Sequence, residues 1–203
     1  MRIVCLSDTH NKPMMEQVPD GDILIHAGDA TIRGTFDEVV EFAKWFYSLP
    51  HLHKIFVPGN HDWLYQRNPK MANSLLPSLH DQLIEIEGLR IYGSSWQPEF
   101  HNWAFGLPRG EQLREVWANI PESVDILVTH TPPRHIRDKI PKSGHVGCDD
   151  LYSRVLSVRP KLHVFGHIHS SYGTTIQDGT IFVNASICNE AYEAKRKPIV
   201  IEL

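Results

Sequence analysis

Residues 2–10 read R-I-V-C-L-S-D-T-H, a short apolar run that ends abruptly in small and polar side chains. The same arrangement recurs four more times, at residues 22–29 (D-I-L-I-H-A-G-D), 54–62 (K-I-F-V-P-G-N-H-D), 125–130 (D-I-L-V-T-H) and 162–169 (L-H-V-F-G-H-I-H). Continuous apolar runs of this length are typical of strands that are buried on both faces of a sheet. The sequence therefore predicts five buried strands, each with Asp, His or Asn just beyond its carboxyl end.

Helical patterns separate these strands. Residues 36–49 carry apolar side chains at three- and four-residue spacing, and Pro50 ends the pattern. Shorter helices are expected at residues 110–118 and 149–158. Residues 82–93 alternate and turn at Glu87-Gly88, which predicts a hairpin, and further strands are expected at 180–184 and 198–202. No repeat or linker divides the sequence. We expect an α/β fold, an αββα sandwich of two stacked mixed β-sheets flanked by helices, with residues 1–203 as a single domain.

Composition narrows the class of partner. The chain has 203 residues, of which 41% are hydrophobic and 22% charged, and its formal net charge is −4. The short run Lys195–Lys197 is its only concentrated basic stretch. Because binding to duplex nucleic acid needs a basic face, no stable nucleic-acid partner is expected. A small phosphodiester or nucleotide remains a possible substrate, since bound cations could supply positive charge locally.

The sequence also indicates a compartment. No apolar run reaches the roughly 20 residues that a membrane-spanning helix needs, and no signal-peptide pattern precedes the first strand. Cys5, Cys148 and Cys188 are too few and too widely spaced for a disulfide framework. We therefore expect a cytoplasmic protein with free thiols and no membrane partner. The sequence predicts no oligomeric state.

The polar residues after the strands suggest a metal site. Ligands of open α/β sheets bind beyond the carboxyl ends of the strands, and residues two apart in an extended segment face the same way. Glycines at 28, 59 and 166 precede candidate ligands and let the backbone turn tightly. Carboxylate and imidazole without thiolate suit divalent Zn, Mn or Fe. The candidates are Asp8, His10, Asp29, Asn60, His61, His130, His167 and His169.

Each of these residues alone also has an ordinary structural explanation. An aspartate can cap a helix, an asparagine can accept a positive φ in a turn, and a histidine after a strand is more often a hydrogen-bonded turn residue. Their joint occurrence in five similar settings favours the metal site. The chain has 13 histidines, and the others, apart from His101, are expected to be structural. His26 and His163 are expected in the core, and surface or loop positions are expected for His51, His53, His80, His135 and His145.

Taken in order, Asp-x-His, Gly-Asp, Gly-Asn-His-Asp, Thr-His and Gly-His-x-His resemble the motifs of the calcineurin-like metallophosphoesterase superfamily. The resemblance runs from residue 5 to about residue 169. Residues 96–98 (W-Q-P), 103–105 (W-A-F), 166–170 (G-H-I-H-S) and 183–186 (V-N-A-S) further resemble the small metallophosphoesterase-domain proteins of vertebrate brain and their microbial relatives. That branch is associated with phosphodiesterase activity towards cyclic nucleotides and artificial diesters.

This resemblance implies two divalent metal ions and a role for each motif residue. Two such ions would hold a hydroxide between them and clamp the phosphate oxygens. Their identity would be Mn, Fe, Zn or Ni, with Mn expected for activity. His61 would act as general acid at the leaving oxygen, and Asp62 would orient its ring. The first ion would be bound by Asp8, His10 and His169 and the second by Asn60, His130 and His167, with Asp29 bridging the two.

The sequence selects no residue for contact with substrate. Arg33, Arg134, Trp96 and His101 are candidates, and the aromatic segment 96–105 either stacks a nucleobase or packs on the sheet as an apolar flap. Phosphoprotein phosphatases of the superfamily have an aspartate where this chain has Ile32, which favours a small diester such as a cyclic nucleotide or bis-p-nitrophenyl phosphate. The alternatives are a phosphomonoesterase or nuclease of the same fold, and a nucleotide-binding protein with weak activity.

Overall fold

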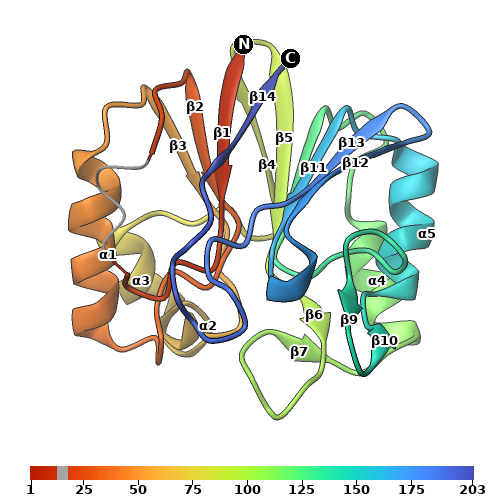
Figure 1. The fold of residues 1–203 in the computed structure, drawn as a ribbon, viewed down its shortest axis with the longest axis horizontal. Coiled ribbons are helices and arrows are strands. Elements are labelled where there is room, and N and C mark those ends of the chain that lie inside the picture. The colour runs from red at the N-terminus through yellow and green to blue at the C-terminus, as the bar shows by residue number, and fades with distance from the viewer. Residues whose placement is uncertain (13–17) are drawn as a thin grey trace.

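Two β-sheets stack face to face in the computed structural model, which describes residues 1–12 and 18–203 (Figure 1). The first sheet has the strand order β14-β1-β2-β3. Strands β1 to β3 are parallel, and β14 pairs antiparallel with β1. Each of these strands lies within one residue of its predicted position. Their bounds are β1 (Arg2–Leu6), β2 (Ile23–His26), β3 (His53–Phe56) and β14 (Ile199–Glu202).

The second sheet has six strands in the order β12-β13-β11-β8-β5-β4. Its four middle strands are parallel, and β12 and β4 run antiparallel at the edges. The predicted hairpin is confirmed as β4 and β5, with Glu87 and Gly88 at positive φ in the turn. The bounds are β4 (Gln82–Ile86), β5 (Leu89–Ser94), β8 (Ile126–Thr129), β11 (Leu162–Phe165), β12 (Gly173–Gln177) and β13 (Thr180–Asn184).

Helices cover the outer faces of both sheets. Figure 1 shows α1 (Phe36–Ser48) and α3 (Pro69–Leu75) beside the first sheet, with the short α2 (Trp63–Arg67) near its lower edge. Helices α4 (Glu111–Ala118) and α5 (Asp149–Val158) flank the second sheet. The predicted αββα sandwich and its three helices are therefore confirmed. The sequence analysis did not anticipate α2 and α3.

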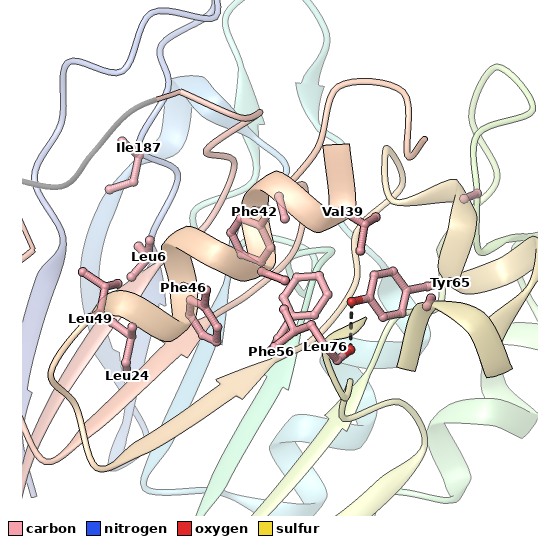
Figure 2. Packing of buried hydrophobic residues seen from close by; sticks show 14 of the residues in the cluster. Leu6, Leu24, Val39, Phe42, Phe46, Leu49, Phe56, Tyr65, Leu76 and Ile187 are labelled. Carbon is pink, nitrogen blue, oxygen red and sulfur yellow. Dashed lines mark hydrogen bonds between the residues drawn. The ribbon is translucent and has the colours of Figure 1, made fainter. Parts of the chain in front are cut away.

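The apolar side chains of each inner strand divide between two layers. In β1, Ile3 and Cys5 pack in the core between the sheets, whereas Val4 and Leu6 pack in the core beneath the helices. This division explains why the strand has no polar face. Figure 2 shows the helix-side core, where Phe42 and Phe46 of α1 lie over strand residues of the first sheet. A third core packs the second sheet against α4 and α5.

Two short two-stranded ribbons lie at the carboxyl ends of the parallel strands (Figure 1). One pairs β6 (Gln97–Pro98) with β7 (Gly106–Leu107), and the other pairs β9 (Lys139–Ile140) with β10 (Gly144–His145). The three cysteines are free and buried. Within residues 1–12 and 18–203, no helix has the length and apolar character needed to cross a membrane.

Candidate metal centre

The loops after β1, β2, β3, β8 and β11 meet at one edge of the sandwich and bring the predicted ligands together. Ligand atoms of Asp8, His10 and His169 all lie within 4.8 Å of one another, and so do those of Asp29, His130 and His167. Asp29 forms a third such group with His10 and His61. Its carboxylate therefore lies between the first two groups. Oδ1 of Asn60 lies 3.0 Å from Nε2 of His130 in the second group.

The backbone of these loops is strained at the candidate ligands themselves. Asp8, His10, Asp29 and His167 all have φ between +46° and +66°. A residue other than glycine pays about 1–3 kcal/mol for this left-handed conformation, which persists only where its surroundings impose it. Such strain concentrates at functional sites. The conformation turns each side chain out of its strand direction and towards the shared centre.

Two of the predicted glycines allow the ligand loops to approach closely. A Cβ atom on Gly59 would lie 2.3 Å from the backbone nitrogen of Asp29, and one on Gly166 would lie 2.1 Å from Oδ2 of Asp8. Neither distance is possible for a real side chain. The absence of a side chain at these two positions therefore places the carboxylates of Asp8 and Asp29 where they are.

Four histidines of the site are oriented in the same manner. Each has Nδ1 within hydrogen-bond distance of a backbone carbonyl, so Nδ1 must carry the hydrogen and donate it. In a neutral ring Nε2 then presents a lone pair towards the centre of the site. Metal-binding histidines are typically oriented by such a bond. The pairs are His10 with Thr31 (3.0 Å), His61 with Ile32 (2.6 Å), His130 with Ala27 (2.8 Å) and His169 with Asn189 (2.9 Å).

The Nε2 atoms that face the centre of the site are placed where they could bind metal ions. Nε2 of His130 lies 3.0 Å from Oδ1 of Asn60 and 3.2 Å from Oδ2 of Asp29. Nε2 of His169 lies 3.2 Å from Oδ1 of Asp8. Nε2 of His10 is buried and makes no hydrogen bond. Lone pairs that converge in this way repel one another unless a proton or a cation lies between them. The nitrogen and oxygen donor set, without thiolate, suits divalent Mn, Fe, Zn or Ni.

The electrostatics of the site agree with cation binding. Burial alone would raise the pKa of Asp8, but His169, His130 and His10 keep it well below the ordinary value. Asp29 is affected in the same way by His130 and His61, so its pKa is lowered too. Burial would lower the pKa of His130, yet the neighbouring carboxylates raise it to about 9. The carboxylates thus stay ionised, and a proton on His130 occupies a place that a cation can take.

Asp62 has a different role from the one predicted. Its carboxylate accepts hydrogen bonds from the backbone and hydroxyl of Thr31 (3.0 and 2.7 Å) and from the backbone of Gly59 (2.7 Å) and Ala30 (3.3 Å). The prediction that Asp62 orients the ring of His61 is therefore wrong. The side chain points into the loop after β2, and burial raises its pKa to about 6. It ties this loop to the one after β3.

A cavity of about 650 Å³ opens beside the cluster. The cluster contributes Asp29, Asn60, His61, His167 and His169 to its lining. Trp103 also lines it, and its ring stacks on that of His61 with centroids 4.2 Å apart at 30°. The two short ribbons and the loop before β14 supply further lining residues, which include Pro98, Glu99, Phe100, Arg109, Ile140, Pro141, Val146, Glu190 and Tyr192.

The four residues proposed for substrate contact do not line this cavity. Arg33 is exposed, and Arg134 pairs with Asp149 at 3.4 Å. Trp96 donates to Asp81 at 2.6 Å and packs on His80 and Phe105. The ring of His101 lies 4.1 Å from that of Phe100. Trp96 and His101 are turned elsewhere because the segment that contains them folds back on itself in the ribbon of β6 and β7.

Sequence reasoning did not single out several cavity residues, among them Phe100, Trp103, Arg109 and Tyr192. The first two belong to the aromatic segment that the sequence analysis singled out, so composition did signal them. Nothing local signals Arg109 or Tyr192, because neither lies near a motif. Tyr192 reaches the site only through the packing of the loop that precedes β14.

Three of the other histidines are fully or almost fully buried. His26 and His163 lie in the core as predicted, with Nε2 2.9 Å from the hydroxyl of Thr9 and of Thr129 respectively. His51 was expected at the surface or in a loop, and it lies in the loop between α1 and β3, where it is only 3% exposed. Its Nε2 donates to the carbonyl of Pro19 at 3.0 Å, which holds the ring against the segment before β2.

Acidic and imidazole ligands gathered at the carboxyl edge of an αββα sandwich define the class of metallophosphoesterases. Residues 1–171 match the family model of the calcineurin-like phosphoesterases. The chain belongs to this family, whose members hydrolyse phosphoesters with divalent metals, and the predicted resemblance is confirmed.

Individual proteins and solved structures that are similar to this chain are consistent with the family assignment. The chain is 43% identical to metallophosphoesterase domain-containing protein 1 of Homo sapiens, over all of this chain and 71% of the human protein. A solved structure of phosphopantetheinyl hydrolase from Mycobacterium tuberculosis has a TM-score of 0.66 at 18% identity, with 97% and 95% of the two chains covered. A purple acid phosphatase from yellow lupin has a TM-score of 0.54 at 13% identity, covering 91% of this chain and 43% of the other. Both structures are similar in fold.

Proposed function

We propose that the protein hydrolyses phosphodiester bonds of small substrates, such as cyclic nucleotides or bis-p-nitrophenyl phosphate, with Mn²⁺ as the activating metal. The first ion would be held by Asp8, His10 and His169 and the second by Asn60, His130 and His167. The position of Asp29 carries the proposal. Its carboxylate belongs to one ligand group with His10 and to another with His130 and His167, and it lines the cavity.

When bound, two divalent ions supply an activated water molecule and positive charge for the phosphate oxygens. The protein supplies a fixed geometry, because each Nδ1–carbonyl bond sets the plane of a ligand ring. His61 would be the proton donor. Its Nδ1 is held by Ile32, its Nε2 lies 4.0 Å from Asp29, and it lines the cavity. A proton on Nε2 can therefore pass to the oxygen of a leaving group.

The charges in the cavity support a diester substrate over a monoester. Arg109 is the only Lys or Arg among the described lining residues. Its guanidinium is already engaged, since it donates to the carbonyls of Val146 (2.7 Å) and Gly147 (2.8 Å) and lies 3.7 Å from Asp149. A monoester carries one more negative charge than a diester at neutral pH. Because no free Lys or Arg side chain among the described lining residues adds to the charge of the metal ions, the singly charged diester is the better fit.

The test compares bis-p-nitrophenyl phosphate with p-nitrophenyl phosphate in the presence of Mn²⁺. We expect the diester to have the higher kcat/KM, and Asp29→Asn to abolish turnover and to reduce the metal content below two ions per chain. Asp178→Asn, the same change in the exposed turn between β12 and β13, is the matched control.

Three results would contradict the proposal. Faster hydrolysis of the monoester would favour a phosphomonoesterase, and cleavage of long single-stranded DNA in preference to small diesters would favour a nuclease. Two bound ions without turnover of either ester would favour a nucleotide-binding protein.

A further inference from the structure

We infer that Phe100, Trp103 and Tyr192 form an aromatic subsite that selects diesters whose non-leaving group is a flat, uncharged ring. The inference rests on the proposed function, because it names the part of the substrate that the cavity binds. The aromatic segment 96–105 is thereby given a role, through two of its members that face the cavity.

The three aromatic side chains line the same cavity as the metal-ligand cluster. Trp103 stacks on His61. The ring of Tyr192 lies 4.8 Å from that of His10, 5.2 Å from that of His169 and 6.2 Å from that of His61. Aromatic surface thus begins directly beside the ligands. An organic group attached to a phosphate at the cluster would lie against this surface.

Two of these rings are incompletely covered by the protein. Phe100 is 55% exposed and Tyr192 is 46% exposed, although both are large apolar residues at the wall of a cavity. Stacking a flat ring against them would remove apolar surface from water on both partners and satisfy the preferred geometry of aromatic pairs. A methyl or other small alkyl group would cover much less of this surface.

The charge of the lining selects against a charged group. Glu99 and Glu190 line the cavity together with Asp29, and Arg109 donates to backbone carbonyls. A carboxylate or second phosphate on the non-leaving group would meet acidic side chains without a free cation. The observed lining therefore favours a neutral ring.

The loop of Tyr192 is built to hold this side chain beside the cluster. The side-chain oxygen of Asn189 accepts from the backbone of Ala191 (2.9 Å) and Glu193 (3.0 Å), which shapes the turn. The carbonyl of Asn189 accepts both the backbone N–H of Tyr192 (2.9 Å) and Nδ1 of His169 (2.9 Å). Tyr192 also keeps a strained φ of +57°. One residue therefore positions both the aromatic wall and a metal ligand.

The experiment uses diesters that share p-nitrophenol as leaving group and differ only in the other group. We expect the phenyl and thymidine-5′ esters to exceed the methyl ester by about tenfold or more in kcat/KM, the effect of one stacked ring. A 4-carboxyphenyl ester is expected to be slower than the phenyl ester. Whichever of the phenyl and thymidine esters is faster identifies a simple aryl group or a nucleobase as the preferred ring, and either order supports the subsite.

The readout for variants is the ratio of kcat/KM for the phenyl ester over the methyl ester. Tyr192→Leu and Phe100→Leu remove a ring and should lower the ratio several-fold, whereas Tyr192→Phe should retain it. Phe36→Leu is the matched control, because Phe36 is 46% exposed at the start of α1 and does not line the cavity. Inhibition of the wild-type protein by phenylphosphonate and by methylphosphonate gives a second measurement that needs no variant.

The outcomes separate the two proposals. Hydrolysis of all diesters at similar rates, or an unchanged ratio in both leucine variants, overturns the aromatic subsite and leaves the phosphodiesterase proposal intact. Equal inhibition by the two phosphonates also counts against the subsite. Failure of the Mn²⁺-loaded protein to hydrolyse any of the diesters, the methyl ester included, overturns the proposed function and the subsite with it.

Discussion

His61 is contacted on three parts of its ring by residues from two segments, the loop after β2 and the segment between β6 and β7. Ile32 accepts the Nδ1 hydrogen, Trp103 covers one face, and Asp29 lies 4.0 Å from Nε2. These contacts leave Nε2 as the atom that can exchange a proton with a substrate. Because His61 also forms a possible ligand group with His10 and Asp29, a proton-donor role has to be separated from a metal-ligand role by experiment.

At the residue scale we expect His61→Gln to slow the hydrolysis of diesters with alkyl leaving groups by about 10²–10⁴-fold. The loss with p-nitrophenol as leaving group should be much smaller, since p-nitrophenolate departs without protonation. Metal content, measured by elemental analysis, should remain that of the wild-type protein. An equal loss on both kinds of ester together with the loss of one ion would instead make His61 a ligand.

His163 allows a prediction about acid stability. Burial lowers its pKa from 6.5 to about 3 in the folded protein. Between these pH values the unfolded chain binds a proton that the folded chain refuses, so the free energy of unfolding decreases as the pH falls. The loss is about 1.4 kcal/mol per pH unit for this residue, and the full stability is present above pH 6.5.

His163→Gln keeps an N–H donor for Thr129 but does not titrate in this range. Urea unfolding from pH 7 to pH 4.5 should therefore show a shallower pH dependence for the variant than for the wild type. If the free energy of unfolding changes equally with pH in the two proteins, the lowered pKa of His163 is contradicted. His26, whose pKa is also lowered to about 3, is present in both proteins and contributes equally.

At the scale of elements, α1 begins with a capping box formed by Thr35 and Glu38. The hydroxyl of Thr35 accepts the backbone N–H of Glu38, and the carboxylate of Glu38 accepts the backbone N–H of Thr35. We expect Thr35→Ala to lower the free energy of unfolding by about 1 kcal/mol, and Thr35→Ser to change it by less. The midpoint of urea unfolding measures this change in stability, provided that the dependence of the free energy of unfolding on urea concentration is the same in both proteins. Equal midpoints for Thr35→Ala and wild type would refute the prediction.

The elements also differ in how far sequence can predict them. Strands such as β1 and β11 are long enough for a continuous apolar run to signal burial on both faces. The ribbons of β6 with β7 and β9 with β10 have only two residues per strand, which is too short for any periodicity. Pro98 and Ile140 of these strands, together with residues of the loops that the ribbons enclose, nevertheless form part of the cavity wall. The part of the site that we propose to recognise substrate is therefore the part with the weakest local signal.

At the scale of the whole molecule, the candidate ligands come from both sheets. Asp8, Asp29 and Asn60 follow strands of the first sheet, whereas His130 and His167 follow strands of the second. Metal ions at the candidate centre would thus connect the two halves of the sandwich. Because they bind the folded chain and not the unfolded one, they should stabilise it.

We expect saturating Mn²⁺ to raise the melting temperature. At about 100 times the dissociation constant the stabilisation is about 2.7 kcal/mol, which corresponds to roughly 5–11 °C for a chain of this size. Differential scanning calorimetry should show the shift in wild type and a much smaller one in Asp29→Asn. Each shift is measured against the metal-free melting temperature of the same protein, because Asp29→Asn also removes the ion pair of Asp29 with His130 at 3.2 Å. An equal shift in both proteins would place the stabilising ions elsewhere.

The amino-acid sequence alone determined the strand-and-loop blocks and the set of candidate ligands that converge, because both are local. A buried run ends, a polar residue follows, and parallel strands bring their carboxyl ends to one edge. Tertiary packing decided the rest. Asp62 turns away from its neighbour His61 to bind the loop after β2, and Tyr192 enters the site from a loop more than 20 residues beyond His169. Such contacts join segments distant in the chain, so no window of sequence contains both partners.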